Sequence, residues 1–248
     1  MSAPSVKWME NRICLSGRLG MIAGFISEGA GVVDVGTDHG YIPAFLAQRG
    51  GYGRIVAADL RQGPLSRARA TAEKAGVAER IEFVCTDGLQ GIDPRGLDTV
   101  SIAGMGGETI RAILAAAPWT RQNGIKMVLQ PQSKQDELLP WLMDAGCAVM
   151  NARLVRDAGR LYSVLLVAGG QGHHRTLSPA EIYADRHLLE NRDPLLAEYL
   201  DALSGRFTNA LRGMEKSISA AEPDERERLL EFLRGLAVMR EETKKWPK

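Results

Sequence analysis

The stretch VVDVGTDHGYIP, residues 32–43, resembles a buried strand that leads into a ligand-binding turn. Apolar and β-branched residues run up to Gly36, as they do in a strand that is covered on both faces. A nucleotide-binding turn usually continues with further glycines, but this chain has Thr37, Asp38 and His39. The G-x-G-x-x-G pattern of dinucleotide-binding turns is therefore absent, which argues against a turn that cradles a pyrophosphate.

Short β-rich runs alternate with helix-compatible stretches from residue 32 to about residue 170. Alternation of this kind, with continuous apolar strands, predicts an α/β fold whose mostly parallel sheet is covered on both sides. One helix is expected over residues 63–76, where alanines and a leucine recur at helical spacing. The predicted strands are residues 32–36, 54–60, 81–87, 98–104 and 126–131.

Two further strand-like runs follow, residues 147–155 and 160–169, and only RDAG (156–159) separates them. Four residues cannot carry the crossover that parallel strands require, so these runs must form an antiparallel hairpin. A parallel sheet that ends in an antiparallel hairpin is typical of the class I methyltransferase (Rossmann-like) fold. A plain dinucleotide-binding domain would more often continue with another crossover helix.

The pattern becomes helical after the glycine-rich residues 169–175. Two apolar series are separated by a polar turn at residues 219–227, so we expect a coiled-coil-like helical hairpin. The sequence thus predicts a methyltransferase domain over residues 1–171 and a helical appendage over residues 172–248. The first series consists of Leu196, Leu200, Leu203, Phe207, Ala210 and Met214, and the second of Leu229, Leu233, Leu236 and Met239.

Composition is that of an ordinary globular protein, with 45% hydrophobic residues, 25% charged residues and a formal net charge of +1. No apolar run approaches the roughly 20 residues of a membrane span, so we expect no membrane partner and a cytoplasmic location. The three cysteines, Cys14, Cys85 and Cys147, lack metal-ligand spacing, so we expect reduced thiols and no metal.

Acidic residues stand at the ends of the second and third predicted strands, at the edge where ligands bind in open parallel sheets. Asp59 lies where a carboxylate can accept both ribose hydroxyls of an adenosine, a feature that NAD and S-adenosylmethionine sites share. Asp87 could accept from the adenine amino group, or it could form a simple Asp-Gly turn with Gly88. A solvated acid at the strand end is the alternative for Asp59.

Asp38 distinguishes the two cofactors by charge. A pyrophosphate is an anion that favours bare backbone amides, and a neighbouring carboxylate would repel it. S-adenosylmethionine carries a cationic sulfonium and an ammonium group, which a carboxylate attracts. The sequence therefore favours S-adenosylmethionine as the cofactor.

Other side chains at the strand ends have two possible roles each. His39 could cap a helix or fix the loop, or it could contact the cofactor. Tyr41 could stack on the methionine end or pack in the core, and Met105 in AGMGG (103–107) could lie against adenine or fill a tight turn. Gln130, in LQPQ (129–132), could hydrogen-bond a base edge.

Seven segments resemble the TrmK family of bacterial tRNA (adenine-22-N1)-methyltransferases over roughly residues 14–170. Departures from the family pattern include Gln132, where Asn or Met is expected, and Ser178, which replaces a glycine. The segments are SGRLGMIAGFI, DVGTDHGYIP, ADLRQGPLSRA, CTDGLQGI, IAGMGGETI, LQPQ and GRLYSVLLV.

This resemblance implies methyl transfer from S-adenosylmethionine to N1 of an unpaired or flipped adenine in tRNA. It also implies a catalytic role for Asp38 and positioning of the base by Gln130 and Pro131. The implied cofactor contacts are Gly36, Thr37, Asp38, His39, Tyr41, Asp59, Leu60, Asp87, Gly88, Ala103, Gly104, Met105 and Gly106.

Two other functions stay open on the residues alone. The chain could methylate a small metabolite, with the C-terminal helices as a homodimer contact, or it could bind S-adenosylmethionine without catalysis and hold a partner protein. A tRNA partner would require a basic surface. Candidates for that surface are Arg12, Arg18, Arg153, Arg156 and Arg160.

Overall fold

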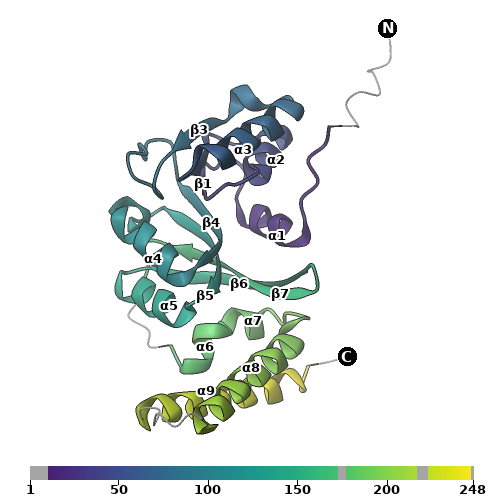
Figure 1. Ribbon diagram of the computed structural model, residues 1–248, viewed down its shortest axis with the longest axis vertical. Coiled ribbons are helices and arrows are strands. Elements are labelled where there is room, and N and C mark those ends of the chain that lie inside the picture. The colour runs from purple at the N-terminus through teal and green to yellow at the C-terminus, as the bar shows by residue number, and fades with distance from the viewer. Residues whose placement is uncertain (1–10, 173–176, 217–222, 247–248) are drawn as a thin grey trace.

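The computed structural model describes residues 11–172, 177–216 and 223–246 of the chain (Figure 1). Seven strands form one sheet in the order β3-β2-β1-β4-β5-β7-β6. Strands β1 to β5 pair in parallel, whereas β7 is antiparallel to both β5 and β6. The predicted parallel sheet with a terminal hairpin is confirmed. The strands are β1 Val32–Val35, β2 Ile55–Asp59, β3 Glu82–Cys85, β4 Thr99–Gly106, β5 Lys126–Ser133, β6 Ala148–Asp157 and β7 Arg160–Ala168.

Both faces of the sheet are covered, as the continuous apolar strands require. Val32 of β1 packs in one hydrophobic cluster with α1 (Gly17–Phe25) and α2 (Tyr41–Arg49). Its neighbour Val33 packs in a second cluster on the opposite face, with α4 (Gly107–Ala116) and α5 (Gln135–Asp144). Successive strand residues point to opposite faces, so this alternation places a helical layer on each side.

The hairpin between β6 and β7 is tighter than predicted. Strand β6 continues through Asp157 and β7 begins at Arg160, so only Ala158 and Gly159 form the turn. Their φ angles of 46° and 76° are both positive, as a type I′ turn requires, and this turn matches the twist of the strands that it joins. Two of the four residues RDAG therefore belong to the strand.

Ser178, the departure from the family pattern, begins α6 (Pro179–Tyr183). Its hydroxyl accepts a hydrogen bond from the backbone N–H of Glu181, and the Glu181 carboxylate accepts one from the backbone N–H of Ser178. This capping box satisfies two amide donors at the start of the helix, so the serine has a local structural role.

The C-terminal helices pack on the sheet domain through α6 and α7 (Arg186–Glu190), with α8 (Leu196–Lys216) and α9 (Pro223–Thr243) outermost (Figure 1). The Asp193 carboxylate, which is buried, accepts a hydrogen bond of 2.9 Å from the backbone N–H of Leu154 in β6. The hydrophobic cluster on this face of the sheet also includes Leu200 of α8 and Leu236 of α9. The appendage and the sheet thus share one core.

The predicted seam of α8 departs from the structure at Ala210. Leu196, Leu200 and Leu203 are buried, but Ala210 is exposed. At Phe207, α8 meets Phe232 of α9 and Tyr183 of α6 in an aromatic cluster, and Met214 beyond Ala210 is half-buried. Most of the predicted polar turn, residues 219–227, lies outside the described residues.

Candidate functional site

The candidate site lies at the carboxyl ends of β1, β2, β4 and β5. The order of the strands reverses between β1 and β4, and ligands bind at such switch points in open α/β sheets. The backbone N–H groups of Gly36 and Thr37 both donate to the carbonyl of Ala58 in β2, at 2.9 and 3.0 Å. The turn after β1 is therefore fastened to the neighbouring strand before it reaches Asp38.

Asp34 supports this turn from below. Its carboxylate accepts hydrogen bonds of 2.8 Å from the hydroxyl of Thr37 and of 2.8 Å from the hydroxyl of Ser101 in β4. Burial raises the Asp34 pKa from 3.8 to about 6, with a smaller raising effect from Asp59, while the two hydroxyls act in the opposite direction. Sequence reasoning missed this residue, although an aspartate inside an apolar strand was a signal for it.

Asp59 and Asp38 come together at the carboxyl ends of β1 and β2. The Asp59 carboxylate is buried and accepts from the backbone N–H of Asp38 at 3.3 Å and from that of Arg61 at 3.1 Å. Asp38 has a φ of 49°, which an aspartate tolerates better than most residues with a side chain. Asp59 thereby orders the loop that carries Asp38.

The side chain of Asp38 is exposed and has a cationic partner that the sequence did not reveal. Arg67 of α3 (Gln62–Lys74) donates to Asp38 Oδ1 at 2.6 Å, and His39 Nε2 lies 3.6 Å from Oδ2. Arg67 is 29 residues away, so no local pattern links it to Asp38.

His39 does not cap α2, so that part of the prediction is wrong. The residue at the N-cap is Gly40, with a φ of 65° and no side-chain hydrogen bond to the helix. The His39 ring instead stacks on Tyr41, with centroids 5.6 Å apart and planes 16° apart. Tyr41 is 42% exposed, which excludes the core-packing alternative for its ring.

Met105 lies directly over Gly36. A Cβ atom on Gly36 would be 2.2 Å from the Met105 methyl group, and the φ of Gly36 is +69°. Glycine at this position therefore permits both the turn and the approach of the methionine. The predicted turn in AGMGG is wrong in part, since β4 continues to Gly106 with an irregular register against β5 at Met105. Contact between Met105 and adenine stays a prediction.

Gln130 holds the ends of β4 and β5 together. Its side-chain oxygen accepts from Arg18 Nη1 of α1 at 3.0 Å and from the backbone N–H of Gly104 at 3.2 Å. Its side chain is 1% exposed, and Pro131 beside it is also buried. The Gln130 amide is thus engaged within the protein, and its contact with a base edge stays a prediction; Gln132 carries an exposed amide at this edge.

Asp87 and Gly88 form the Asp-Gly turn that was the simpler of the two readings. The Asp87 carbonyl accepts from the backbone N–H of Gln90 at 3.1 Å, and Gly88 has a φ of 59°. The Asp87 side chain is exposed, as is Leu60, which has 63% of its surface accessible beside Asp59. Their contacts with adenine stay predictions.

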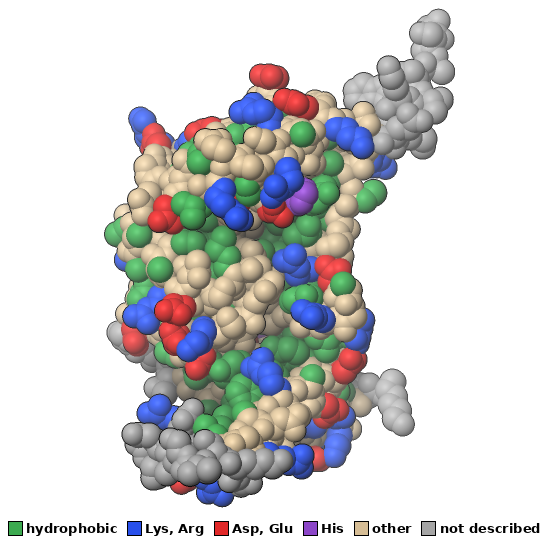
Figure 2. All heavy atoms as spheres, in the orientation of Figure 1, with side chains coloured by type: hydrophobic (Ala, Val, Ile, Leu, Met, Phe, Trp, Pro, Cys, Tyr) green, Lys and Arg blue, Asp and Glu red, His purple; other side chains and the backbone are tan. Residues whose placement is uncertain are grey.

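Two of the predicted basic residues are engaged within the protein. Arg18 points inward to Gln130, and Arg156 is paired with Glu198. Figure 2 shows Lys and Arg side chains spread over the visible face, with Asp and Glu side chains among them. Arg12 lies apart from the hairpin, in a depression of about 1290 Å³ between the N-terminal segment and the ends of α2 and α3, together with Arg49, Lys74 and Arg80.

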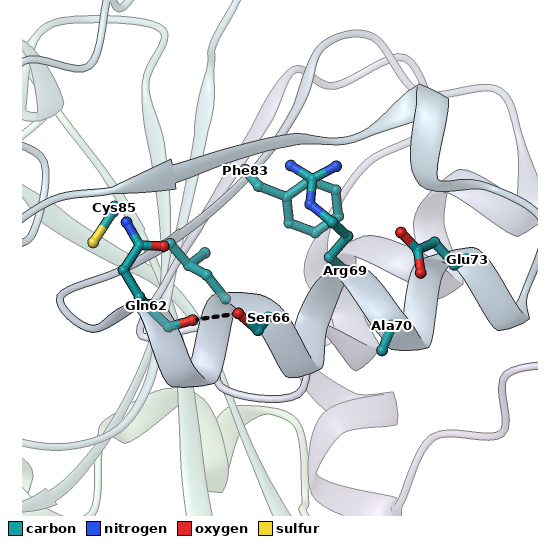
Figure 3. A pocket seen from close by; sticks show the side chains of 8 residues that line it. Gln62, Ser66, Arg69, Ala70, Glu73, Phe83 and Cys85 are labelled. Atoms are coloured by element: carbon teal, nitrogen blue, oxygen red, sulfur yellow. Dashed lines mark hydrogen bonds between the residues drawn. The ribbon is translucent and has the colours of Figure 1, made fainter.

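A smaller hollow of about 220 Å³ runs between α3 and the edge strand β3 (Figure 3). Arg69 lies over the Phe83 ring there, at 4.5 Å from the centroid, and the exposed Cys85 stands at one end. None of the predicted site residues lines this hollow. In the described part of the chain no group of three potential metal ligands occurs, and no helix is long and apolar enough to cross a bilayer.

Comparison with known proteins places this geometry in context. Residues 15–165 match the family described as a methyltransferase domain. A tRNA (adenine(22)-N(1))-methyltransferase of Bacillus subtilis is 31% identical over 160 residues, which are 64% of this chain and 67% of the relative.

Solved structures extend the likeness into the C-terminal helices. Sp1610 of Streptococcus pneumoniae, in complex with S-adenosyl-L-methionine, has 27% identity and a TM-score of 0.78, covering 92% of this chain and 100% of that one. The m1A22 tRNA methyltransferase TrmK of B. subtilis shares the fold, with 24% identity and a TM-score of 0.75 over 94% of this chain and 99% of that one.

Proposed function

The chain belongs to the TrmK family of tRNA (adenine-22-N1)-methyltransferases, and we propose that it transfers a methyl group from S-adenosylmethionine to N1 of adenine 22 in tRNA. The observation that carries this proposal is the meeting of Asp38 and Asp59 at the ends of β1 and β2. Two carboxylates at this edge suit a cofactor that brings a sulfonium, an ammonium group and two ribose hydroxyls.

The chemistry is an in-line displacement. The lone pair of adenine N1 attacks the methyl carbon, the carbon–sulfur bond breaks, and its electron pair stays on sulfur, which becomes a neutral thioether. The protein contributes mainly by holding the two reactants in line. The base must leave its stack to expose N1, which lies on the Watson–Crick edge.

Asp38 is the proposed catalytic carboxylate. Methylation makes the adenine cationic, and a carboxylate beside the ring stabilises that charge. The ion pair with Arg67, at 2.6 Å, favours such an electrostatic role over acceptance of the N6 proton, because Arg67 already occupies one carboxylate oxygen. Pro131 shapes the floor of the base site, and Gln130 acts by positioning Gly104.

The tRNA backbone requires cations outside the site. The depression near α2 and α3 offers Arg12, Lys74 and Arg80, which have no ion-pair partner among the described residues. We expect phosphates to bind there, because each neutralised phosphate releases counterions. Replacing Arg80 by alanine should lower the slope of log affinity against log salt by about 1. An unchanged slope would place the RNA elsewhere.

The location, the domain division and the oligomeric state of the protein are further proposals. We place the protein in the cytoplasm, where its tRNA substrate is found, and divide it into residues 1–171 and 172–248. A homodimer through α8 and α9 has little apolar surface available, since Val238 is the large hydrophobic side chain that is exposed on the described parts of these helices. Sedimentation velocity tests this contact directly.

The decisive experiment is methyl transfer from labelled S-adenosylmethionine to bulk bacterial tRNA, with the modified nucleoside identified by mass spectrometry. We expect 1-methyladenosine, its loss in a transcript with guanine at position 22, and its loss in Asp59→Ala. Asp144→Ala is the matched control, because Asp144 is exposed at the end of α5 and makes no hydrogen bond or ion pair with a described residue.

Two outcomes would replace the proposal. Cofactor binding without methylation of correctly folded tRNA, but with methylation of a small metabolite, would establish the metabolite enzyme. Cofactor binding with no turnover on either kind of substrate would establish a binding protein.

A further inference from the structure

We propose that Arg18 binds the α-carboxylate of the cofactor's amino-acid end, an inference that rests on the proposed S-adenosylmethionine site. The cofactor carries two cationic groups and one anionic group. The carboxylates of Asp38 and Asp59 suit its ammonium, sulfonium and hydroxyl groups. Its own carboxylate requires a cation, and the structure brings a guanidinium to the opposite side of the same sheet edge.

The start of α1 is fixed in place before Arg18 extends toward the site. Ser16 is the N-cap residue, and its hydroxyl donates to Asp157 Oδ2 at 2.7 Å. The same carboxylate oxygen accepts from the backbone N–H of Arg18 at 3.3 Å. The tip of the β6–β7 hairpin thus anchors the first turn of α1 and sets the origin of the Arg18 side chain.

The guanidinium then reaches the end of β4. Nη1 donates to the Gln130 side-chain oxygen at 3.0 Å, and that oxygen also accepts from the backbone N–H of Gly104 at 3.2 Å. A Cβ atom on Gly104 would lie 3.8 Å from Nη1, so the guanidinium stands beside this backbone. Met105, the next residue, covers Gly36 of the cofactor turn.

Arg18 retains donors for a ligand. A guanidinium has five N–H donors, and in the described residues the Arg18 guanidinium makes one hydrogen bond, to Gln130. Its Nε lies 4.0 Å from Asp157 Oδ2, which is too long for a hydrogen bond, and its flat face lies 5.6 Å from the Tyr162 ring centroid. With 24% of its side chain exposed, it is oriented and still accessible.

The other guanidinium that faces the turn is already engaged. Arg67 is paired with Asp38 at 2.6 Å, so it cannot hold the cofactor carboxylate without releasing Asp38. A planar guanidinium with free donors on one side matches a carboxylate in a two-bond arrangement, which is stronger than a neutral hydrogen bond. Arg18 is thus the cation whose partners leave it available.

The test compares two ligands that differ only in the carboxylate: S-adenosylhomocysteine and its decarboxylated analogue, measured by calorimetry. In the wild-type protein, we expect removal of the carboxylate to weaken binding by roughly 10- to 100-fold. In Arg18→Met, both ligands should bind with the affinity that the wild type shows for the decarboxylated one. Arg18→Lys should recover part of the preference for the carboxylate.

Gln130→Met is the matched control, because it removes the link to Gly104 and keeps the Arg18 charge. This variant should weaken the binding of both ligands by the same factor and preserve the ratio of their affinities. If Arg18→Met also weakens both ligands equally, or if the wild type binds the two alike, the proposal is wrong and Arg18 only positions Gly104.

If Arg18→Met raises the KM for tRNA and leaves the binding of both ligands unchanged, Arg18 contacts an RNA phosphate, and the proposal is wrong. Should Arg18→Met fail to fold, Arg18→Lys and the ligand comparison in the wild type still decide. A protein that shows the expected ligand ratio and does not methylate tRNA would contradict the proposed function and leave the carboxylate site intact.

Discussion

The sheet edge that carries the candidate site and the helical pair α8–α9 are held together by different forces. At the edge, each buried polar group has two hydrogen-bond partners: Asp34 has two hydroxyls, Asp59 has two backbone amides, and Gln130 has Arg18 and Gly104. In the helices, an aromatic cluster and leucine side chains fill most of the interior, and the ion pair between Arg240 and Asp201 lies at the surface.

Substitutions in these two regions should therefore affect different properties of the protein. A hydrogen bond at a fixed angle has no substitute, so a change at the edge should alter ligand binding as well as stability. An apolar contact is non-directional, so a change in the helices should alter stability and leave the distant site unaffected. Each of the following predictions tests one side of this contrast.

The largest effect on stability is expected from Phe232→Ala. The Phe232 ring is 4% exposed and lies 4.3 Å from Phe207 and 5.1 Å from Tyr183, between ring centroids. Removing it should cost about 3–5 kcal/mol of unfolding free energy, because the cavity cannot collapse fully. Urea denaturation measures this cost, and calorimetry should show the affinity for S-adenosylhomocysteine unchanged within about twofold.

Phe232→Leu is the matched control, since it retains much of the volume and should cost less than about 1.5 kcal/mol. A loss of cofactor affinity in Phe232→Ala as large as the loss of stability would contradict the contrast. It would show that the helices and the site are energetically coupled.

Asp34 provides the next largest effect, through pH. Its pKa in the folded protein is raised from 3.8 to about 6 by burial, so between these values the folded state binds more protons than the unfolded state. The free energy of unfolding should therefore fall as pH rises through this window, by about 3 kcal/mol in total.

Asp34→Asn should remove this contribution while preserving the side-chain size. The measurement is urea denaturation of both proteins without cofactor at pH 4 and pH 7. The difference in unfolding free energy between the wild type and the variant should change by about 2 kcal/mol between these pH values, with the wild type comparatively less stable at pH 7. Parallel pH profiles would show that Asp34 is not desolvated.

Gly36→Ala tests whether the turn after β1 tolerates a side chain. The residue has a φ of +69°, where a side chain costs about 1–2 kcal/mol, and its new methyl group would lie 2.2 Å from the Met105 methyl carbon. We expect a loss of stability of about 1–3 kcal/mol and a clear loss of affinity for S-adenosylhomocysteine. Calorimetry and denaturation of the same sample separate the two losses.

Two variants sharpen this prediction. Gly24→Ala in α1, where a Cβ would meet nothing within 4 Å, should be neutral or stabilising. The double variant with Met105→Ala should relieve the clash and retain the backbone strain. Full recovery of stability in that double variant would mean that the φ of Gly36 carries no cost.

The sequence predicted most accurately those features that depend on neighbouring residues. Gly36, Asp38 and Asp59 follow directly from the ends of apolar strands, because parallel strands end at one edge of a sheet. The antiparallel hairpin followed from a linker too short for any other connection. In both cases a local pattern determines the outcome.

Features that depend on distant residues were missed or misjudged. Arg18 reaches Gln130 across 112 residues and Arg67 reaches Asp38 across 29, so their roles appear only in the folded chain. Ala210 was included in the seam of α8 for a related reason. The apolar spacing includes it, but burial requires a partner surface, and Ala210 is exposed in the described structure.

The smallest effect should come from the outer polar contact of the helices. Arg240 donates from Nε and Nη2 to the two oxygens of Asp201, at 2.8 and 3.1 Å, and Asp201 is 59% exposed. Water and salt screen such a pair, so a double-mutant cycle of Arg240→Ala and Asp201→Ala should give a coupling of about 0.2–1 kcal/mol. Raising the salt concentration should reduce it further.

Arg240 and Arg18 thus allow a direct comparison of the two regions, because one arginine lies in the helices and the other at the sheet edge. Arg240 donates hydrogen bonds to both oxygens of the exposed Asp201 carboxylate, so its replacement should change the free energy of unfolding little. Arg18 donates to one buried amide oxygen, that of Gln130, and keeps free N–H donors, so its replacement should lower the affinity for the ligand. A coupling above about 2 kcal/mol at Arg240 would mean that directional polar contacts stabilise the helices as well, and that the two regions are not built differently.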